Sequence, residues 1–336
     1  MKTAKTKSGY WEEFWQLTRR HLLVFFRNKV RIFFTLMVPF IIFVIYILFL
    51  RDLELGMANN ILEKLGKEYD VSLTSDATLI SHINTIVDSW MMSGIIAICT
   101  ITVSFQACTT IVNDREHGVN RDFVSSPISH NLLIGSYFLF NIIVTVLVCF
   151  VFILCCLIYL ACLGEFMITF VDFLTIFATL LFSSVSSVLL TVFISSFISR
   201  DATMASVNTI FSTAVGFLIG AYMPLAMMPD WAQNICAFFP GTYSCSMLRY
   251  AFLSTPSKEL ISYIGTLGLP FADELVAQVT SSFGFGIKFF GTDVATNYQS
   301  LAQFVFIAVL IAANVVSGKK LISVIGSMGK RIKKKK

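Results

Sequence analysis

Six long apolar runs divide the chain, and more polar segments separate them. A helix needs about 20 mostly apolar residues to cross roughly 30 Å of hydrocarbon, and each run is long enough to do so. The interior of each run lacks Asp, Glu, Lys, Arg and His. The pattern predicts six transmembrane helices, at about residues 32–50, 90–112, 132–162, 173–199, 202–223 and 298–317.

The composition agrees with a chain that lies mostly in a membrane. Hydrophobic residues make up 56% of the 336 residues and charged residues only 13%, whereas a soluble domain has about 25% charged residues. So few charges cannot cover a water-facing surface of this size. This excludes a soluble enzyme, a disordered protein and a nucleic-acid binder, so the fold class is an all-α integral membrane protein.

The distribution of basic residues predicts the orientation. Most of the 25 lysines and arginines lie in the N-terminal arm, the C-terminal tail and the short loops on the same side. Because basic residues are retained on the cytoplasmic side, both termini are expected in the cytoplasm of a plasma-membrane protein. The resulting segments are a cytoplasmic arm (1–31), a membrane domain (32–318) with outer loops at 51–89 and 224–297, and a basic tail (319–336).

Residues 10–28 have the periodicity of an amphipathic helix. Aromatic and aliphatic side chains recur on one face, and charged ones on the other. A helix with this pattern lies in the headgroup zone of a bilayer, whereas the alternative, packing on a cytosolic domain, needs a domain that these segments do not supply. We expect an interfacial helix that contacts membrane lipids through Trp11, Trp15, Arg19 and Arg20.

The loop between the second and third predicted spans is short, charged and cytoplasmic. Asp114, Arg115 and Glu116 are followed by Gly118, which permits a sharp turn, and later by Pro127. A charged connector is the simple interpretation. The three consecutive charges followed by a turn indicate instead a segment that docks into a groove on a partner.

The outer segment after the fifth predicted span contains two apolar stretches around Pro240-Gly241. Each stretch is about ten residues, too short to span a bilayer. They predict a re-entrant helical hairpin that dips into the outer leaflet. Its aromatic residues either anchor the hairpin or close the outer end of a pathway by excluding water. The predicted gate consists of Trp231, Phe238, Phe239, Pro240 and Tyr243.

Motifs for catalysis, nucleotide binding and metal binding are missing from the sequence. It has no G-x-x-x-x-G-K-[ST] phosphate loop, no H-E-x-x-H and no C-x-x-C. Cys236 and Cys245 are the two cysteines on the outer side, and free thiols are favoured over a bridge. We therefore expect no catalytic residue, no metal site and no cofactor in this chain, so any uphill transport takes its energy from elsewhere.

Two local motifs, at matching places in the predicted topology, resemble those of ABC-2 type transporter permeases, the membrane subunits of type V ABC exporters. The first is Asp114 to Val119 followed by Ser125-Ser126-Pro127; Val119 stands where the family often has Thr. The second is Met228-Pro229-Asp230-Trp231, then Pro240-Gly241-Thr242-Tyr243 and Arg249. The resemblance covers nearly the whole chain.

The resemblance implies a dimer, with a second copy or a homologous permease, and a cytosolic ABC ATPase dimer that holds ATP and Mg. The fifth span would line the dimer seam, where Gly216 and Gly220 form a small-xxx-small pair, although packing within the protomer explains the pair equally well. The residues implied to receive the ATPase's motion are Asp114, Arg115, Glu116, His117, Gly118, Ser126, Pro127, Arg200 and Asp201.

The function implied is export of an amphipathic or hydrophobic drug, lipid or peptide, powered by the separate ATPase. One alternative is a permease for polysaccharides or lipid-linked glycans. An alternative of another class is a membrane enzyme or assembly scaffold for lipid-linked substrates. Co-purification of a nucleotide-binding subunit separates the exporter from this last alternative.

Overall fold

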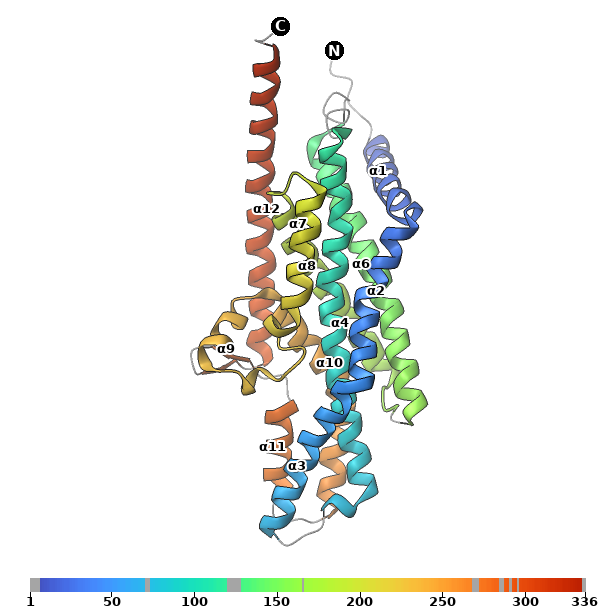
Figure 1. Ribbon diagram of the computed structural model, residues 1–336, viewed down its shortest axis with the longest axis vertical. Helices are drawn as coiled ribbons and strands as arrows, with labels where there is room; N and C mark the ends of the chain where they lie inside the picture. The colour runs from blue at the N-terminus through green and yellow to red at the C-terminus, as the bar shows by residue number, and fades with distance from the viewer. Residues whose placement is uncertain are drawn as a thin grey trace.

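The computed structural model is an elongated bundle of helices (Figure 1). It describes residues 7–69, 73–119, 128–164, 166–267, 272–283, 287–289, 292–294 and 296–333. Five of its helical segments are long and apolar enough to cross a membrane: Lys29–Tyr69, Ala77–Glu116, Asn131–Leu163, Phe170–Ser195 and Tyr298–Ser317. The predicted helical membrane fold is therefore confirmed in outline.

The N-terminal part consists of α1 (Lys7–Arg27) and a long second helix. The second helix runs without interruption through α2 (Lys29–Ile45), the π-helical turn η1 (Tyr46–Leu50) and α3 (Arg51–Tyr69). Its 41 residues measure about 60 Å, about twice the hydrocarbon thickness. The first predicted span, 32–50, is therefore only part of a helix that continues outward.

The central helix is α4 (Ala77–Glu116), which packs against α6, α7, α8 and α10. Within its most apolar window, 94% of the residues are buried. The Asp76 side chain caps its first turn by accepting from the amides of Thr78 and Leu79. The outward helical extension predicted for the second span is therefore present, and it is preceded by the short 3-10 helix η2 (Leu73–Ser75).

Helices α6 (His130–Leu163) and α12 (Thr296–Lys333) contain the third and sixth predicted spans, and α7 (Phe170–Ser195) covers the fourth except for its last four residues, 196–199. Only 17% of the most apolar window of α12 is buried within the chain. Its exposed apolar surface suits contact with lipid or with another membrane helix. The end of α12 and the start of α1 lie at the same end of the molecule (Figure 1).

The fifth predicted span, 202–223, corresponds to α8 (Asp201–Leu218), which has 18 residues. It measures about 27 Å and is not among the five membrane-crossing candidates. The helix ends early because Gly220 adopts a left-handed conformation, with φ +65°. The count of six spans therefore stays a prediction.

The outer hairpin differs from the prediction. The 3-10 helix η3 (Leu225–Met227) and α9 (Asp230–Ala237) are short, but α10 (Pro240–Leu267) has 28 residues and packs against α4, α7 and α12. The expectation of two ten-residue helices is wrong for the second. Proline at the first position of a helix loses no hydrogen bond, so Pro240 begins α10 rather than ending its neighbour.

The segments predicted to be on the outer side form a helical cap, called the outer cap below, at the end opposite the chain termini (Figure 1). It contains α3, the first part of α4, the last part of α10 and α11 (Ala272–Phe283). The Tyr263 hydroxyl donates to Asp76 at 2.9 Å, which ties α10 to the start of α4. Two short antiparallel strands, β1 (Ile287–Phe289) and β2 (Thr292–Val294), pair Ile287 with Val294 and are an exception to the all-α prediction.

Candidate functional site

The last turn of α4 is the place where four other helices, α1, α6, α7 and α8, meet the central helix. Asp114 belongs to this turn and is buried, with 5% of its surface exposed. It accepts from Nη1 of Arg20 on α1 at 2.7 Å and from the hydroxyl of Tyr137 on α6 at 2.7 Å. One carboxylate thus holds α1 and α6 to the end of the central helix.

The next residue, Arg115, caps the C-terminal end of α7 by hydrogen bonding to its carbonyl groups. Its Nη1 donates to the carbonyl oxygens of Ser195 at 2.8 Å and Ile198 at 2.5 Å. The last carbonyl groups of a helix have no partner within it and carry partial negative charge, so a guanidinium there is favourable. Arg115 therefore fixes α7 to α4.

Glu116 connects α4 to the start of α8. Its Oε2 accepts from the backbone amide of Asp201 at 2.6 Å. A carboxylate at a helix N-terminus satisfies an unpaired amide and complements the helix dipole. Arg200 occupies the N-cap position and makes no side-chain cap of its own, so Glu116 supplies the cap from a different helix.

Beyond α4 the chain turns at Gly118, whose φ of +76° is in the left-handed region that favours glycine. His117 is exposed, and its Nδ1 lies 3.0 Å from the carbonyl oxygen of Asn113. The predicted site residues Ser126 and Pro127 lie outside the described residues. The structure thus brings together Asp114, Arg115, Glu116, His117, Gly118, Arg200 and Asp201 around the end of α4.

One expectation about this segment is wrong. The sequence interpretation placed Asp114 and Arg115 on a loop, available to a partner. Both residues instead belong to α4, which continues to Glu116, and both are engaged within the chain. In sequence, a run of charged residues at the end of a helix cannot be distinguished from a solvent-exposed loop. The residues that pair with these charges lie in distant segments of the chain, so the local sequence does not reveal them. Glu116 and His117 remain exposed in this segment, as does Arg200 beside it.

His21 lies beneath this junction and is fully buried. Its ring stacks on Tyr137 with the centroids 4.0 Å apart, and Nε2 lies 3.2 Å from Oγ of Ser136. Because Arg20 can only donate, Nδ1 of His21 accepts from it at 3.1 Å. Ser136 donates to the carbonyl of Leu133, so Nε2–H of His21 donates to Ser136 and the imidazole is neutral.

Acid is expected to destabilise this junction through His21. Burial, and then the charge of Arg20, lower the pKa of His21 from 6.5 to about 4. A depressed histidine pKa means that the unfolded chain binds the proton more readily, so the stabilisation is complete above pH 6.5 and is lost as pH falls toward 4. Between pH 8 and pH 5 we expect the loss of about 2 kcal/mol in the free energy of unfolding.

The measurement is thermal unfolding of the purified chain at both pH values, compared with His21→Gln. The glutamine amide can replace both hydrogen bonds but does not titrate. Other acidic groups contribute equally to both proteins, so the difference isolates His21. A variant with the same pH dependence as the natural chain would show that His21 is not the titrating group.

The helix predicted for residues 10–28 is present as α1, but its buried face differs from the expected one, and its interfacial location stays a prediction. The buried positions of α1 include Thr18, His21 and Phe25, while Trp11 and Trp15 are 69% and 55% exposed. Arg20, expected on the free polar face with Arg19, bonds Asp114 instead. The two tryptophans therefore lie on the outside of the protein, where they are available to lipid.

The residues of the predicted outer gate do not gather at one point. Tyr243 and Pro240 are buried at the start of α10, and the Tyr243 hydroxyl donates to the carbonyl of Ala237 at 2.9 Å. Trp231 and Phe238 are 69% and 60% exposed, while Phe239 packs partly against the main core. Cys236 and Cys245 are both free thiols, as expected. The gating role itself stays a prediction.

The predicted dimer seam is not supported at its two glycines. A Cβ added to Gly216 would lie 2.0 Å from the ring of Tyr222, and one added to Gly220 would lie 2.6 Å from Leu225. Gly220 also follows the end of α8 rather than lying on it. The space beside both glycines is filled by this chain's own turn, which is the alternative that the sequence left open.

The sequence interpretation did not predict two clusters of buried charge, although it named Arg249 as part of a motif. Asp88 on α4 accepts from Arg51 through Nε at 3.0 Å and Nη2 at 2.9 Å, and from the hydroxyl of Tyr46. Arg249 on α10 is 3% exposed, donates to the carbonyl of Gly220, and lies 4.0 Å above the centroid of the Trp90 ring. The signal available was a charged residue at the edge of an apolar run, which usually marks a paired group.

Comparison with known proteins supports one family. A search among curated proteins found no match. The family model described as ABC-2 type transporter matches residues 12–253, which begin within α1, include every helix of the α4 junction and end in the middle of α10. Since that match covers most of the chain and includes four of the five candidate membrane-spanning segments found among the described residues, this protein belongs to the ABC-2 type transporter family.

Proposed function

We propose that this chain is the permease subunit of an ATP-driven exporter in the plasma membrane, with both termini in the cytoplasm. A separate cytosolic ABC ATPase dimer supplies the energy, and a second permease, identical or homologous, completes the pathway. The substrate is an amphipathic or hydrophobic drug, lipid or peptide. Family membership supports the transport role, and the basic tail supports the orientation.

The observation that carries the proposal is the junction at the end of α4. Three consecutive residues connect that end to α1 and α6, to α7 and to α8. Glu116 and His117 are exposed beside these connections. A force applied there by an ATPase subunit reaches four other helices through direct bonds. The segment at 120–127 follows directly and belongs to the same proposed contact.

The first experiment is purification of the tagged full chain from its native membranes in a mild detergent. We expect an ATP-hydrolysing subunit to co-purify in a one-to-one ratio, identified by mass spectrometry and by vanadate-sensitive ATP hydrolysis. A pure, folded chain that carries no such subunit would contradict the exporter and favour a membrane enzyme or scaffold.

Glu116→Gln tests the docking role within that complex. Glutamine can still accept the Asp201 amide bond, and the exposed position predicts a stability change within about 0.5 kcal/mol. We expect about tenfold weaker retention of the ATPase, since an interface contact of this kind is worth about 1–2 kcal/mol. Retention is measured by titrating the purified ATPase onto the immobilised permease.

The matched control is Glu63→Gln. Glu63 is also an exposed helical glutamate, and it pairs with Lys67 at 2.6 Å on α3. It lies in the outer cap, so its loss removes the same charge without touching the proposed contact. Equal retention by Glu116→Gln and Glu63→Gln would exclude Glu116 from the docking surface.

A further inference from the structure

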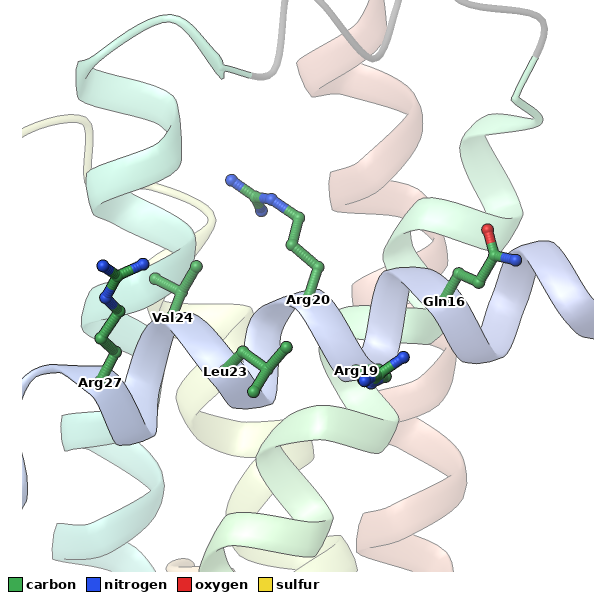
Figure 2. Close-up of a pocket in the computed structure, with 6 residues that line it drawn as sticks. All are labelled: Gln16, Arg19, Arg20, Leu23, Val24 and Arg27. Atoms are coloured by element: carbon green, nitrogen blue, oxygen red, sulfur yellow. The ribbon is translucent and has the colours of Figure 1, made fainter.

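The solvent-facing side of α1 carries an open groove, and the proposed transport role assigns no task to it. Its volume is about 310 Å³. Figure 2 shows Gln16, Arg20 and Arg27 extending to one side of the helix, with Leu23 and Val24 between the arginines. The lining residues are Gln16, Arg19, Arg20, Leu23, Val24 and Arg27.

We propose that this groove binds an anionic phospholipid of the cytoplasmic leaflet. The phosphate lies among the guanidinium groups, and the start of an acyl chain lies against Leu23 and Val24. The inference goes beyond the proposed function, because it concerns a lipid site on this chain whether or not an ATPase docks at the end of α4.

The charges of the groove select an anion. Three of its six lining residues are arginines, and none is acidic. Guanidinium groups bind phosphate through two parallel hydrogen bonds, which makes arginine better suited to this ligand than lysine. Basic residues close to a membrane surface also gain about 1 kcal/mol each from anionic lipids.

The apolar lining selects a lipid over a soluble anion. Leu23 is 58% and Val24 39% exposed, although both lie beside arginines. Trp11 and Trp15 on the same helix are also exposed. Exposed aliphatic and tryptophan side chains next to basic residues are typical of a helix in the headgroup zone, and a free phosphate would gain nothing from them.

The position of the groove along the chain places it at the membrane surface. Only Asn28 separates the end of α1 from the start of α2, which is the first part of a membrane-crossing segment. A residue at the entry to such a segment lies within reach of the lipid headgroups. A cytosolic protein would have to approach the bilayer itself to fill the same groove.

Arg20 connects the groove on α1 to the junction at the end of α4. Its Nη1 donates to Asp114 at 2.7 Å, yet 34% of its side chain is exposed toward the groove. A bound phosphate therefore competes with the Asp114 carboxylate for the same guanidinium. Occupancy of the groove by lipid thereby changes how firmly α1 is held to the end of α4.

The test measures lipid binding by the full-length chain in detergent, without ATPase. Fluorescent phosphatidylglycerol is titrated against the natural chain and against Arg19→Gln/Arg27→Gln, which leaves the Arg20–Asp114 pair in place. We expect about 30-fold weaker binding by the double variant, from two lost cationic contacts. Leu23→Gln should also weaken binding, whereas phosphatidylcholine should bind poorly to all the proteins.

The matched control is Lys64→Gln/Lys67→Gln, which removes two exposed cations from α3 in the outer cap and should leave binding unchanged. Equal binding by both double variants would overturn the proposal. Competition by glycerol 3-phosphate as strong as that by the whole lipid would show an anion site instead of a lipid site. Unchanged lipid binding with loss of ATPase retention in Arg19→Gln/Arg27→Gln would reassign the groove to the ATPase.

Discussion

Replacing Asp88 with alanine will lower the free energy of unfolding by about 3–5 kcal/mol, the largest effect expected for a single side chain here. Asp88 is fully buried and accepts from Arg51 and from Tyr46. Its loss leaves a guanidinium that is only 20% exposed without its counter-charge. The measurement is denaturant unfolding of the purified chain in detergent micelles.

Two further variants make this result interpretable. Asp52→Ala removes an exposed carboxylate one residue beyond Arg51 and should change stability by less than about 0.5 kcal/mol. Combining Asp88→Ala with Arg51→Met should recover part of the loss, because removing both partners of a buried pair costs less than removing one. If Asp88→Ala unfolds at the same denaturant concentration as Asp52→Ala, the ion pair contributes nothing to stability.

Replacing Asp114 with alanine will have the second largest effect, a loss of about 2–4 kcal/mol. Arg20 is partly exposed, so water recovers some of its solvation, but the Tyr137 hydroxyl loses its acceptor inside the bundle. A double-mutant cycle with Arg20→Met measures the pair itself, and we expect a coupling of about 1–3 kcal/mol.

The same variant has a functional consequence under the proposed role. With α1 and α6 released from the end of α4, ATP hydrolysis by the assembled complex should no longer respond to substrate. Glu12→Ala, which removes an exposed acid from α1, serves as the control and should keep the response. Wild-type stimulation in a folded Asp114→Ala complex would show that the pair is structural only.

Most of the membrane helices could be predicted because the bilayer imposes a simple rule. A segment that crosses it must be apolar and must satisfy its backbone internally. The run at 132–162 therefore lies within α6, the run at 173–199 is helical in α7 as far as Ser195, and the predicted extension of the second span is present in α4. Such a prediction does not require knowing which other residues of the chain the helix contacts.

Predictions failed where the outcome depends on contacts between distant segments. Arg20 and Asp114 are 94 positions apart, and no local pattern indicates that they meet. The length of α10 was missed because the residues after Phe252 are more polar and include Pro256, and only the structure shows that the helix continues through them to Leu267. The early end of α8 depends on the conformation of Gly220, which an apolar run does not reveal.

The unbroken helix from Lys29 to Tyr69 has the length and continuity of a lever arm. It begins one residue after α1 and ends in the outer cap, so its two ends are about 60 Å apart. If the rod is stiff, a tilt of about 10° at one end moves the other by about 10 Å, which is the width of a helix. Whether it is stiff depends on the π-turn at Tyr46–Leu50, where the hydrogen-bond ladder changes register. Asp88 accepts from Tyr46, the first residue of that turn, and from Arg51, the residue after it, so the same carboxylate braces the lever arm where its hydrogen-bond ladder changes register.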